Sequence, residues 1–171
     1  VEEFPDGSKA PEIEQKFRRV HGILKDHKFD NLMVATNGGD EFGDFMMDHL
    51  ARLDNEKGVM IAVCTENYGE MTASPYSSNA ELKYALDRKL RVLPLRVVDS
   101  YPPQPPHGPD HAYDKTGEAG TLFNIVVPSS TVFLDCRDKA DTEIARLKTD
   151  MEIARMIAEE LVKFKSGAPA A

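Results

Sequence analysis

Glu81 is the residue of this sequence whose type and position point most clearly to chemistry. It stands near the start of a helix predicted over 78–89, shortly after an apolar run, Val59–Cys64, of strand length. In a parallel α/β sheet, this order of strand, turn and helix brings side chains to the carboxyl edge, where such folds bind ligands. A carboxylate there can stabilise positive charge that develops in a transition state. The alternative is a plain surface glutamate, because the helix dipole alone favours an acid in the first turn.

Three side chains near Glu81 are candidates for substrate binding. Tyr68 and Tyr76 can stack on the flat ring of a ligand, although a tyrosine at a strand end also serves as an amphipathic cover on the core. Ser78 can donate a hydrogen bond to a substrate, and it is equally suited to cap the helix that follows. Both roles of each residue remain open at this point.

Asn37, Gly38 and Gly39 form a second candidate site, in a turn before a predicted helix. Backbone N–H groups in such a turn can bind a phosphate. A lone Gly-Gly pair is a weak signal, however, and a plain turn explains it as well.

His107, His111 and Asp114 bring imidazoles and a carboxylate close together in the sequence, as a metal site would. Their spacing matches no recognised zinc pattern, and a proline-rich loop seldom fixes metal ligands by itself. We therefore predict no metal.

Composition narrows the class of protein. The chain has 171 residues, which suits one domain, predicted over 1–165. Its net charge is -8 and no basic run stands out, so nucleic-acid binding is not expected. Cys64 and Cys136 each fall in an apolar run, as buried thiols do in a reducing compartment. No apolar stretch reaches the length of a membrane span and the first residues do not resemble a signal peptide, so no membrane partner and a cytoplasmic location are expected.

Hydrophobic periodicity predicts alternating strands and helices, a flavodoxin-like α/β fold: a three-layer sandwich with a mainly parallel sheet and a long C-terminal helix. Pro94 indicates an edge strand or an irregular position. The segment 99–120 is rich in Pro and Gly and is predicted to be an ordered loop or a linker, a candidate lid, long enough to contain a short helix. Residues 1–10 are expected to be irregular and 166–171 disordered. The predicted strands are 31–36, 59–64, 90–97 and 131–136, and the predicted helices are 11–27, 42–53, 78–89 and 141–164.

Several of these segments resemble one family. The strand ending in Thr65-Glu66-Asn67-Tyr68, the run Ser78-Asn79-Ala80-Glu81-Leu82 that opens a helix, and the Pro94-containing strand are similar to the TIR (Toll/interleukin-1 receptor) domain. The similarity covers roughly 25–97. Ser78 stands where the family often has Cys, and the family's first strand has no clear counterpart.

The resemblance implies an activity. Enzymatic TIR domains use one helix-borne glutamate to bind the nicotinamide ribose of NAD while the glycosidic bond breaks, and Glu81 matches that position. NAD is then the substrate, and no cofactor is expected. The resemblance further implies a signalling or defence role and activation by homotypic self-association, which would order the loop around Gly38 and Gly39.

Two other functions remain open. The chain can be a non-catalytic TIR-type interaction module, which the atypical Ser78 favours. It can also be similar to nucleoside deoxyribosyltransferases, which share a helix-borne Glu followed by a Tyr-Ala pair, here Glu81 and Tyr84-Ala85.

Overall fold

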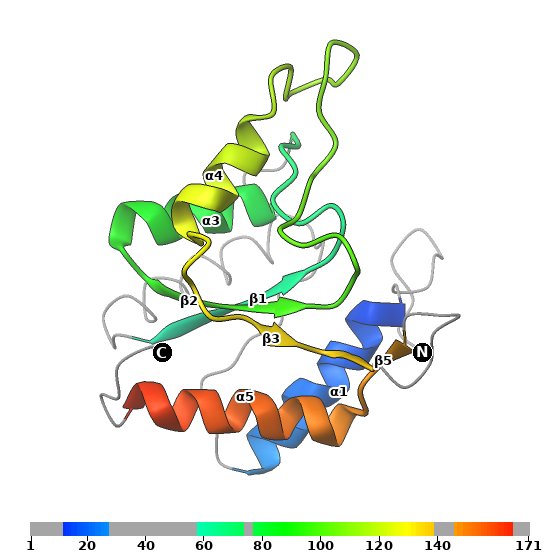
Figure 1. The fold of residues 1–171 in the computed structure, drawn as a ribbon, viewed down its shortest axis with the longest axis vertical. Helices are drawn as coiled ribbons and strands as arrows, with labels where there is room; N and C mark the ends of the chain where they lie inside the picture. Colours follow the sequence, from blue (N-terminus) through cyan, green and yellow to red (C-terminus); the bar gives the residue numbers. More distant parts are fainter. Residues whose placement is uncertain (1–11, 28–57, 74–76, 139–145, 166–171) are drawn as a thin grey trace. The chain divides into compact units, whose positions relative to one another are not determined.

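The computed structural model describes residues 12–27, 58–73, 77–138 and 146–165 (Figure 1). The predicted strand 31–36, the predicted helix 42–53 and the predicted irregular ends 1–10 and 166–171 lie outside the described residues. The described elements fall into two compact units. One contains helices α1 and α5, and the other contains all the remaining elements.

A parallel sheet forms the centre of the larger unit. Its strands β1 (Val59–Cys64), β2 (Arg91–Arg96) and β3 (Leu134–Asp135) lie in the order β1-β2-β3, and both pairings are parallel. A mixed α/β chain with a parallel sheet and a C-terminal helix is consistent with the flavodoxin-like class and confirms that prediction. The predicted boundaries of the first two of these strands are correct to within one residue.

Pro94 lies in the middle strand, so the prediction of an edge position is wrong. In the register of the sheet Pro94 is opposite Ala62 of β1. Strand β3 pairs with β2 only from Leu95 onward. At Pro94 itself, β1 is therefore the one described strand that pairs with β2.

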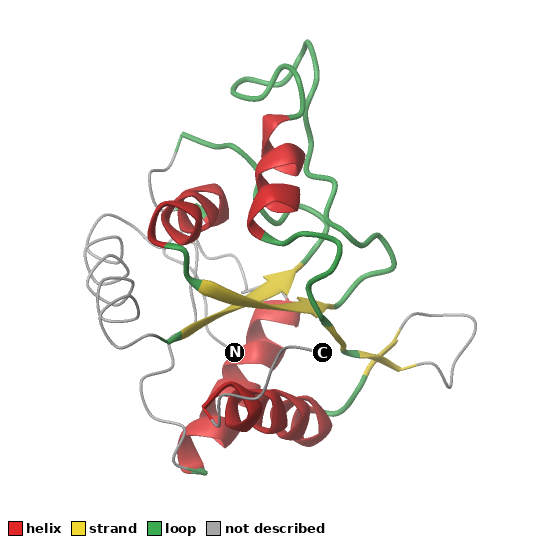
Figure 2. Cartoon of the chain, turned by 60° about the vertical axis from the view of Figure 1, so that its left-hand side comes forward, coloured by secondary structure: helices red, strands yellow, loops and turns green. Residues whose placement is uncertain are grey.

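Two helices, α3 (Ser78–Arg88) and α4 (Glu118–Val126), pack side by side on one face of this sheet (Figure 2). Helix α3 agrees with the predicted helix 78–89. Helix α4 was not placed from the sequence: it begins inside the predicted loop 99–120 and continues beyond it. Its first turn contains Gly120 and its last turn two β-branched residues, which weakens the helical signal.

Aromatic side chains join α4 to the segments around the sheet. Phe123 of α4 is fully buried, and its ring meets the edges of Tyr68 and Tyr101, each at a centroid distance of 6.2 Å. Tyr101 also packs on Phe133, with centroids 4.5 Å apart. Phe123 therefore connects the loop after β1 with the segment after β2.

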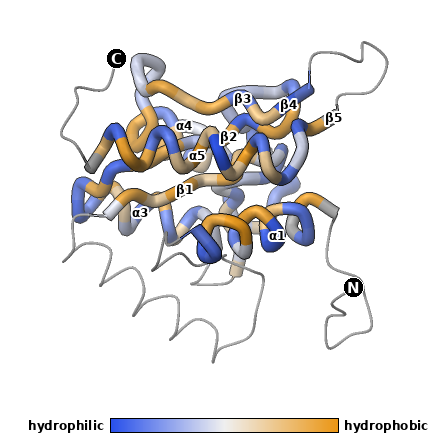
Figure 3. Tube along the Cα trace, turned by 90° about the horizontal axis from the view of Figure 1, so that it is seen from below, coloured by the Kyte–Doolittle hydropathy of each residue, from blue (hydrophilic) through white to orange (hydrophobic). Residues whose placement is uncertain are grey.

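The smaller unit consists of α1 (Glu12–Asp26) packed against α5 (Asp150–Lys165). Asp150 accepts from Lys16 Nζ and Arg19 Nε, both at 2.7 Å. Figure 3 shows hydrophobic positions recurring along both helices between hydrophilic ones, as expected for helices with one buried side. The buried apolar residues are Phe17, Val20 and Leu24 of α1 and Ile153, Ala154 and Ile157 of α5.

The last helix begins later than the predicted residue 141. Residues Arg146–Leu147 form strand β5, which pairs antiparallel with β4 (Arg137–Asp138). Thr149 and Glu152 then exchange hydrogen bonds between their side chains and backbone N–H groups, at 3.1 and 3.2 Å. This capping box sets the start of α5 at Asp150. In the part of the chain that the structure describes, no helix combines the length and hydrophobicity needed to cross a membrane.

Replacing Phe123 with Ala removes the ring on which Tyr68 and Tyr101 pack. We expect the free energy of unfolding to fall by about 3–5 kcal/mol, because the cavity lies in the interior. Urea titration followed by circular dichroism measures the change. Ile125→Ala, at a 55% exposed position of the same helix, is the matched control and should stay within about 0.5 kcal/mol of wild type. Equal losses in the two variants would contradict this role of Phe123.

Candidate functional site

The loop between β1 and α3 is fixed at Gly69. The Gly69 N–H donates to Ser78 Oγ at 2.8 Å, and the Asn79 side-chain amide donates to the Gly69 carbonyl at 3.1 Å. Gly69 has φ +89°, and a Cβ there would lie 3.1 Å from Leu82 Cδ1. The position requires glycine for both reasons.

Ser77, and not Ser78, caps helix α3. Ser77 has extended backbone angles, and its Oγ accepts from the Ala80 N–H at 3.3 Å. The predicted capping role of Ser78 is therefore wrong, because Ser78 is already the first helical residue. Its hydroxyl holds Gly69 instead, so Ser78 shapes the loop.

Glu81 lies in the first turn of α3 and is partly buried. Burial raises the pKa of its carboxyl to about 7. A helix N-terminus favours the ionised form, so desolvation outweighs the helix dipole here.

Tyr68 is buried and close enough to Glu81 for the charge of Glu81 to act on it. It is 8% exposed, and within the described residues its Oη has no hydrogen-bond partner. Burial first, and then the charges of Glu81 and Cys64, raise its pKa well above 10. Its ring packs edge-on against Phe123, so the hydroxyl is the part of Tyr68 left to bind a ligand. A buried hydroxyl without a partner is costly, and such groups gather at functional sites.

The structure thus brings together Tyr68, Ser78 and Glu81 of the predicted site. Tyr76, Asn37, Gly38 and Gly39 lie outside the described residues, so their predicted roles stay predictions. Asn79 was not predicted to contribute, and no local pattern marks it: its role depends on where Gly69 lies in the fold.

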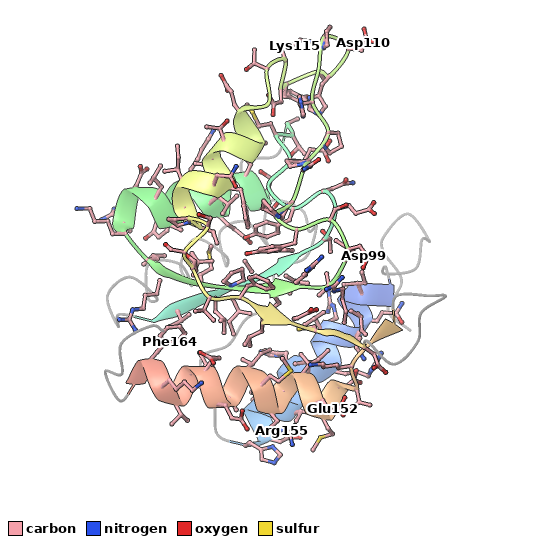
Figure 4. The ribbon with its side chains drawn as sticks, viewed as in Figure 1. Asp99, Asp110, Lys115, Glu152, Arg155 and Phe164 are labelled. Carbon is pink, nitrogen blue, oxygen red and sulfur yellow. The ribbon has the colours of Figure 1, made fainter. Side chains whose placement is uncertain are left out.

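A second loop, residues 98–117, leads from β2 to α4, and we call it the arm. Asp110 and Lys115 lie at its tip, beyond the end of α4 (Figure 4). The arm is braced from within: Lys115 donates to the carbonyls of Pro109 and His111, and the Gly108 N–H donates to the Asp114 carbonyl at 2.9 Å. The arm is therefore an ordered loop, which is one of the two alternatives predicted for 99–120.

Asp114 anchors the arm to α4. It is 1% exposed, and its carboxylate accepts from the N–H groups of Gly117, Glu118 and Ala119 at 2.8–3.0 Å. Burial acts to raise the pKa of Asp114, but these backbone donors outweigh it and lower the pKa. An aspartate just before a helical segment is the sequence signal that could have located the start of α4.

His111 connects the arm to the loop after β1, because its Nε2 lies 3.2 Å from Glu70 Oε1. His107 Nδ1 lies 3.1 Å from the Pro105 carbonyl. The three residues considered as metal ligands therefore have separate partners. No group of three His, Cys, Asp or Glu side chains within the described ranges is placed to hold a metal ion.

Charged side chains at the carboxyl ends of β2 and β3 neutralise one another. Arg137 donates to both carboxylate oxygens of Asp135 at 2.9 Å and to Asp99 at 2.8 Å. The hydrogen bonds from Arg137 lower the pKa of Asp135 to about 2. Nearby, Cys64 and Cys136 are buried free thiols, as predicted, and burial raises the pKa of Cys64 to about 12. Neither group supplies reactive chemistry.

In comparisons with known proteins, no family model, no curated protein and no solved structure matches this chain. The resemblance to TIR domains therefore stays a prediction, and the site must be argued from its own geometry.

Replacing Glu81 with Gln tests its burial without reference to any ligand. An acid whose pKa rises from 4.5 to about 7 on folding destabilises the fold only when it ionises. The destabilisation caused by Glu81 should therefore be absent below pH 4.5 and grow as the pH rises to about 7. At about pH 8 Glu81→Gln should be more stable than wild type by about 1–3 kcal/mol, and at about pH 4 the two should match.

Chemical denaturation across this pH range makes the measurement. Asp87→Asn, at an exposed position of the same helix, is the control and should track wild type at every pH. A Glu81→Gln curve parallel to that of wild type would show that Glu81 is an ordinary surface residue.

Proposed function

We propose that this chain is a TIR-like domain that cleaves the nicotinamide glycosidic bond of NAD. One observation supports this most: Glu81, in the first turn of α3 and close to the loop after β1, has a pKa raised to about 7 by burial. This is the carboxylate that the sequence resemblance matches to the catalytic glutamate. The proposal joins a resemblance in sequence to an unusual environment in the structure.

The reaction suits a single carboxylate. The bond from C1′ of the ribose to the nicotinamide nitrogen breaks, and its electron pair goes to nitrogen. Nicotinamide leaves as a neutral base, so it needs no general acid. Water adds at C1′ and loses a proton to solvent. The ionised Glu81 would stabilise the oxocarbenium-like transition state and accept hydrogen bonds from the ribose hydroxyls.

The neighbours of Glu81 support the same chemistry. Tyr68 Oη, which has no hydrogen-bond partner within the described segments, would donate to an oxygen of the bound ribose or of Glu81. The exclusion of water would strengthen both the interaction of Glu81 with the ribose and the hydrogen bond from Tyr68, because charges act more strongly where water is excluded. The hold of Ser78 and Asn79 on Gly69 fixes the backbone next to Tyr68.

The wider role is proposed with the activity. We infer a cytoplasmic signalling or defence function in which homotypic self-association switches on NAD cleavage. Asn37, Gly38 and Gly39 would lie in the loop that assembly orders. The signalling or defence role and its control by self-association follow from the resemblance alone.

The direct test is nicotinamide release from NAD by concentrated protein, followed by chromatography. Wild type should release nicotinamide, and Glu81→Gln should be slower by at least about 100-fold, because it removes the charge that meets the transition state. Asp87→Asn is the matched control and should keep full activity. Agents that force assembly should increase the rate of wild type.

The other outcomes identify the alternatives. No nicotinamide release by folded, assembled wild type would overturn the proposal and favour a non-catalytic association module. Exchange of bases between deoxynucleosides with no effect on NAD would favour a deoxyribosyltransferase-like enzyme. Equal activity of Glu81→Gln and wild type would show that Glu81 is not the catalytic carboxylate.

The pH profile gives a second, independent test. Glu81 acts in its ionised form, so kcat/KM should rise about tenfold per pH unit in acid and level off above a midpoint near the free-enzyme pKa of about 7. Steady-state rates of nicotinamide release across the range measure it. A profile with an acid limb near pH 4.5, the ordinary value of a glutamate, would contradict the role of burial.

A further inference from the structure

His111 is held at both of its ring nitrogens. Its Nδ1 lies 3.1 Å from the Tyr113 N–H and 2.8 Å from the Asp114 N–H. Both neighbours are backbone donors, so Nδ1 must accept and carries no proton. The proton of the neutral ring is therefore on Nε2, which donates to Glu70 at 3.2 Å.

His107 of the same arm has the opposite arrangement. Its Nδ1 faces the Pro105 carbonyl at 3.1 Å, so Nδ1 carries the proton and donates. A proton added to the ring of His107 goes to Nε2 and leaves that bond intact. A proton added to His111 must go to Nδ1, where it meets two N–H donors.

The bond from His111 reaches the loop that carries Tyr68. Glu70 is two residues after Tyr68 and next to Gly69, which α3 holds from the other side. The loop is thus fixed between α3 and the arm. Truncation of either Glu70 or His111 would remove the hold of the arm and leave the bonds to α3 and the packing of Tyr68 on Phe123.

We propose that His111 is a positioning residue that clasps the arm to the Tyr68 loop, and that acid opens the turn 111–114 by protonating the nitrogen that this turn requires. The inference concerns conformation and is independent of whether the chain cleaves NAD. Protonation strengthens the attraction between the ring and Glu70. It also turns the acceptor of two backbone N–H groups into a donor that faces them, so the turn 111–114 opens.

Within the described residues, charged groups from two segments lie near His111. Glu70 comes from the loop after β1, and its side chain is 28% exposed. From the arm itself, the Lys115 ammonium binds the His111 backbone carbonyl, and the Asp114 carboxylate is engaged with the first N–H groups of α4. The His111 side chain is 14% exposed, so water does not easily replace the lost bonds.

Two variants separate the turn from the bridge. His111→Asn keeps an acceptor oxygen near the position of Nδ1, in the manner of an Asx turn, but it is too short to reach Glu70 and cannot be protonated. Glu70→Ala removes the bridge and leaves the turn. His107→Gln is the matched control on the same arm.

NMR spectroscopy of the full chain reads out both parts. The long-range ¹H–¹⁵N spectrum of the imidazoles should show His111 protonated at Nε2 and His107 at Nδ1 near neutral pH. On acidification, the Tyr113 and Asp114 amides should lose their hydrogen bonds in wild type and keep them in His111→Asn. At neutral pH the Gly69 amide should exchange up to about fivefold faster in His111→Asn and Glu70→Ala than in wild type, and unchanged in His107→Gln.

Three results would overturn the inference. The first is a His111 ring that carries its proton on Nδ1 at neutral pH. The second is a titration of His111 that leaves the Tyr113 and Asp114 amides unmoved. The third is a Gly69 amide whose exchange rate is the same in wild type and in both bridge variants. None of these results depends on NAD turnover, so this inference and the proposed activity can each be overturned without the other.

Discussion

The grip of α3 on Gly69 is the interaction on which the candidate site depends. Two consecutive residues, Ser78 and Asn79, bind the N–H and the carbonyl of a single glycine. Gly69 tolerates no Cβ, because its φ is +89° and Leu82 closes the space. With the backbone fixed at this point, the preceding side chain, Tyr68, turns into the core against Phe123, and the following one, Glu70, meets the arm. One clamped peptide thus lies between two side chains that have different partners.

Glu81 and Tyr68 both place a polar group where it lowers the stability of the fold. The first turn of a helix should stabilise an ionised acid, yet burial prevails and the pKa of Glu81 rises to about 7. Tyr68 places a hydroxyl in the interior and, among the described residues, gives it no hydrogen-bond partner. Each group lowers the stability of the fold, and local rules of this kind are broken mainly at functional sites. In contrast, the buried carboxylate of Asp114 is fully supplied with donors and acts as a structural anchor.

Sequence patterns predicted those parts of the fold that depend on local periodicity. Strand β1 and helix α3 were placed almost to the residue, and Glu81 with them, because an apolar run and a helical stripe are local signals. Helix α4 was not placed, since its N-terminal cap is Gly117, which offers no side chain, and Asp114 supplies the bonds from three residues earlier. The start of α5 was set too early because the pairing of β4 with β5 is not a local signal. Asn79 and Glu70 have roles that only the folded chain defines.

The arm illustrates how a segment that reads as a linker becomes part of a site. Its prolines restrict the backbone, but proline alone does not tie a loop to its neighbours. That is done by Asp114, which joins the arm to α4, and by His111, which joins it to the loop after β1. The loop after β1 and the arm, which follows β2, both leave from the carboxyl edge of the parallel sheet. Because parallel strands gather their outgoing loops at this edge, two such loops that brace each other form a more rigid site than either would alone.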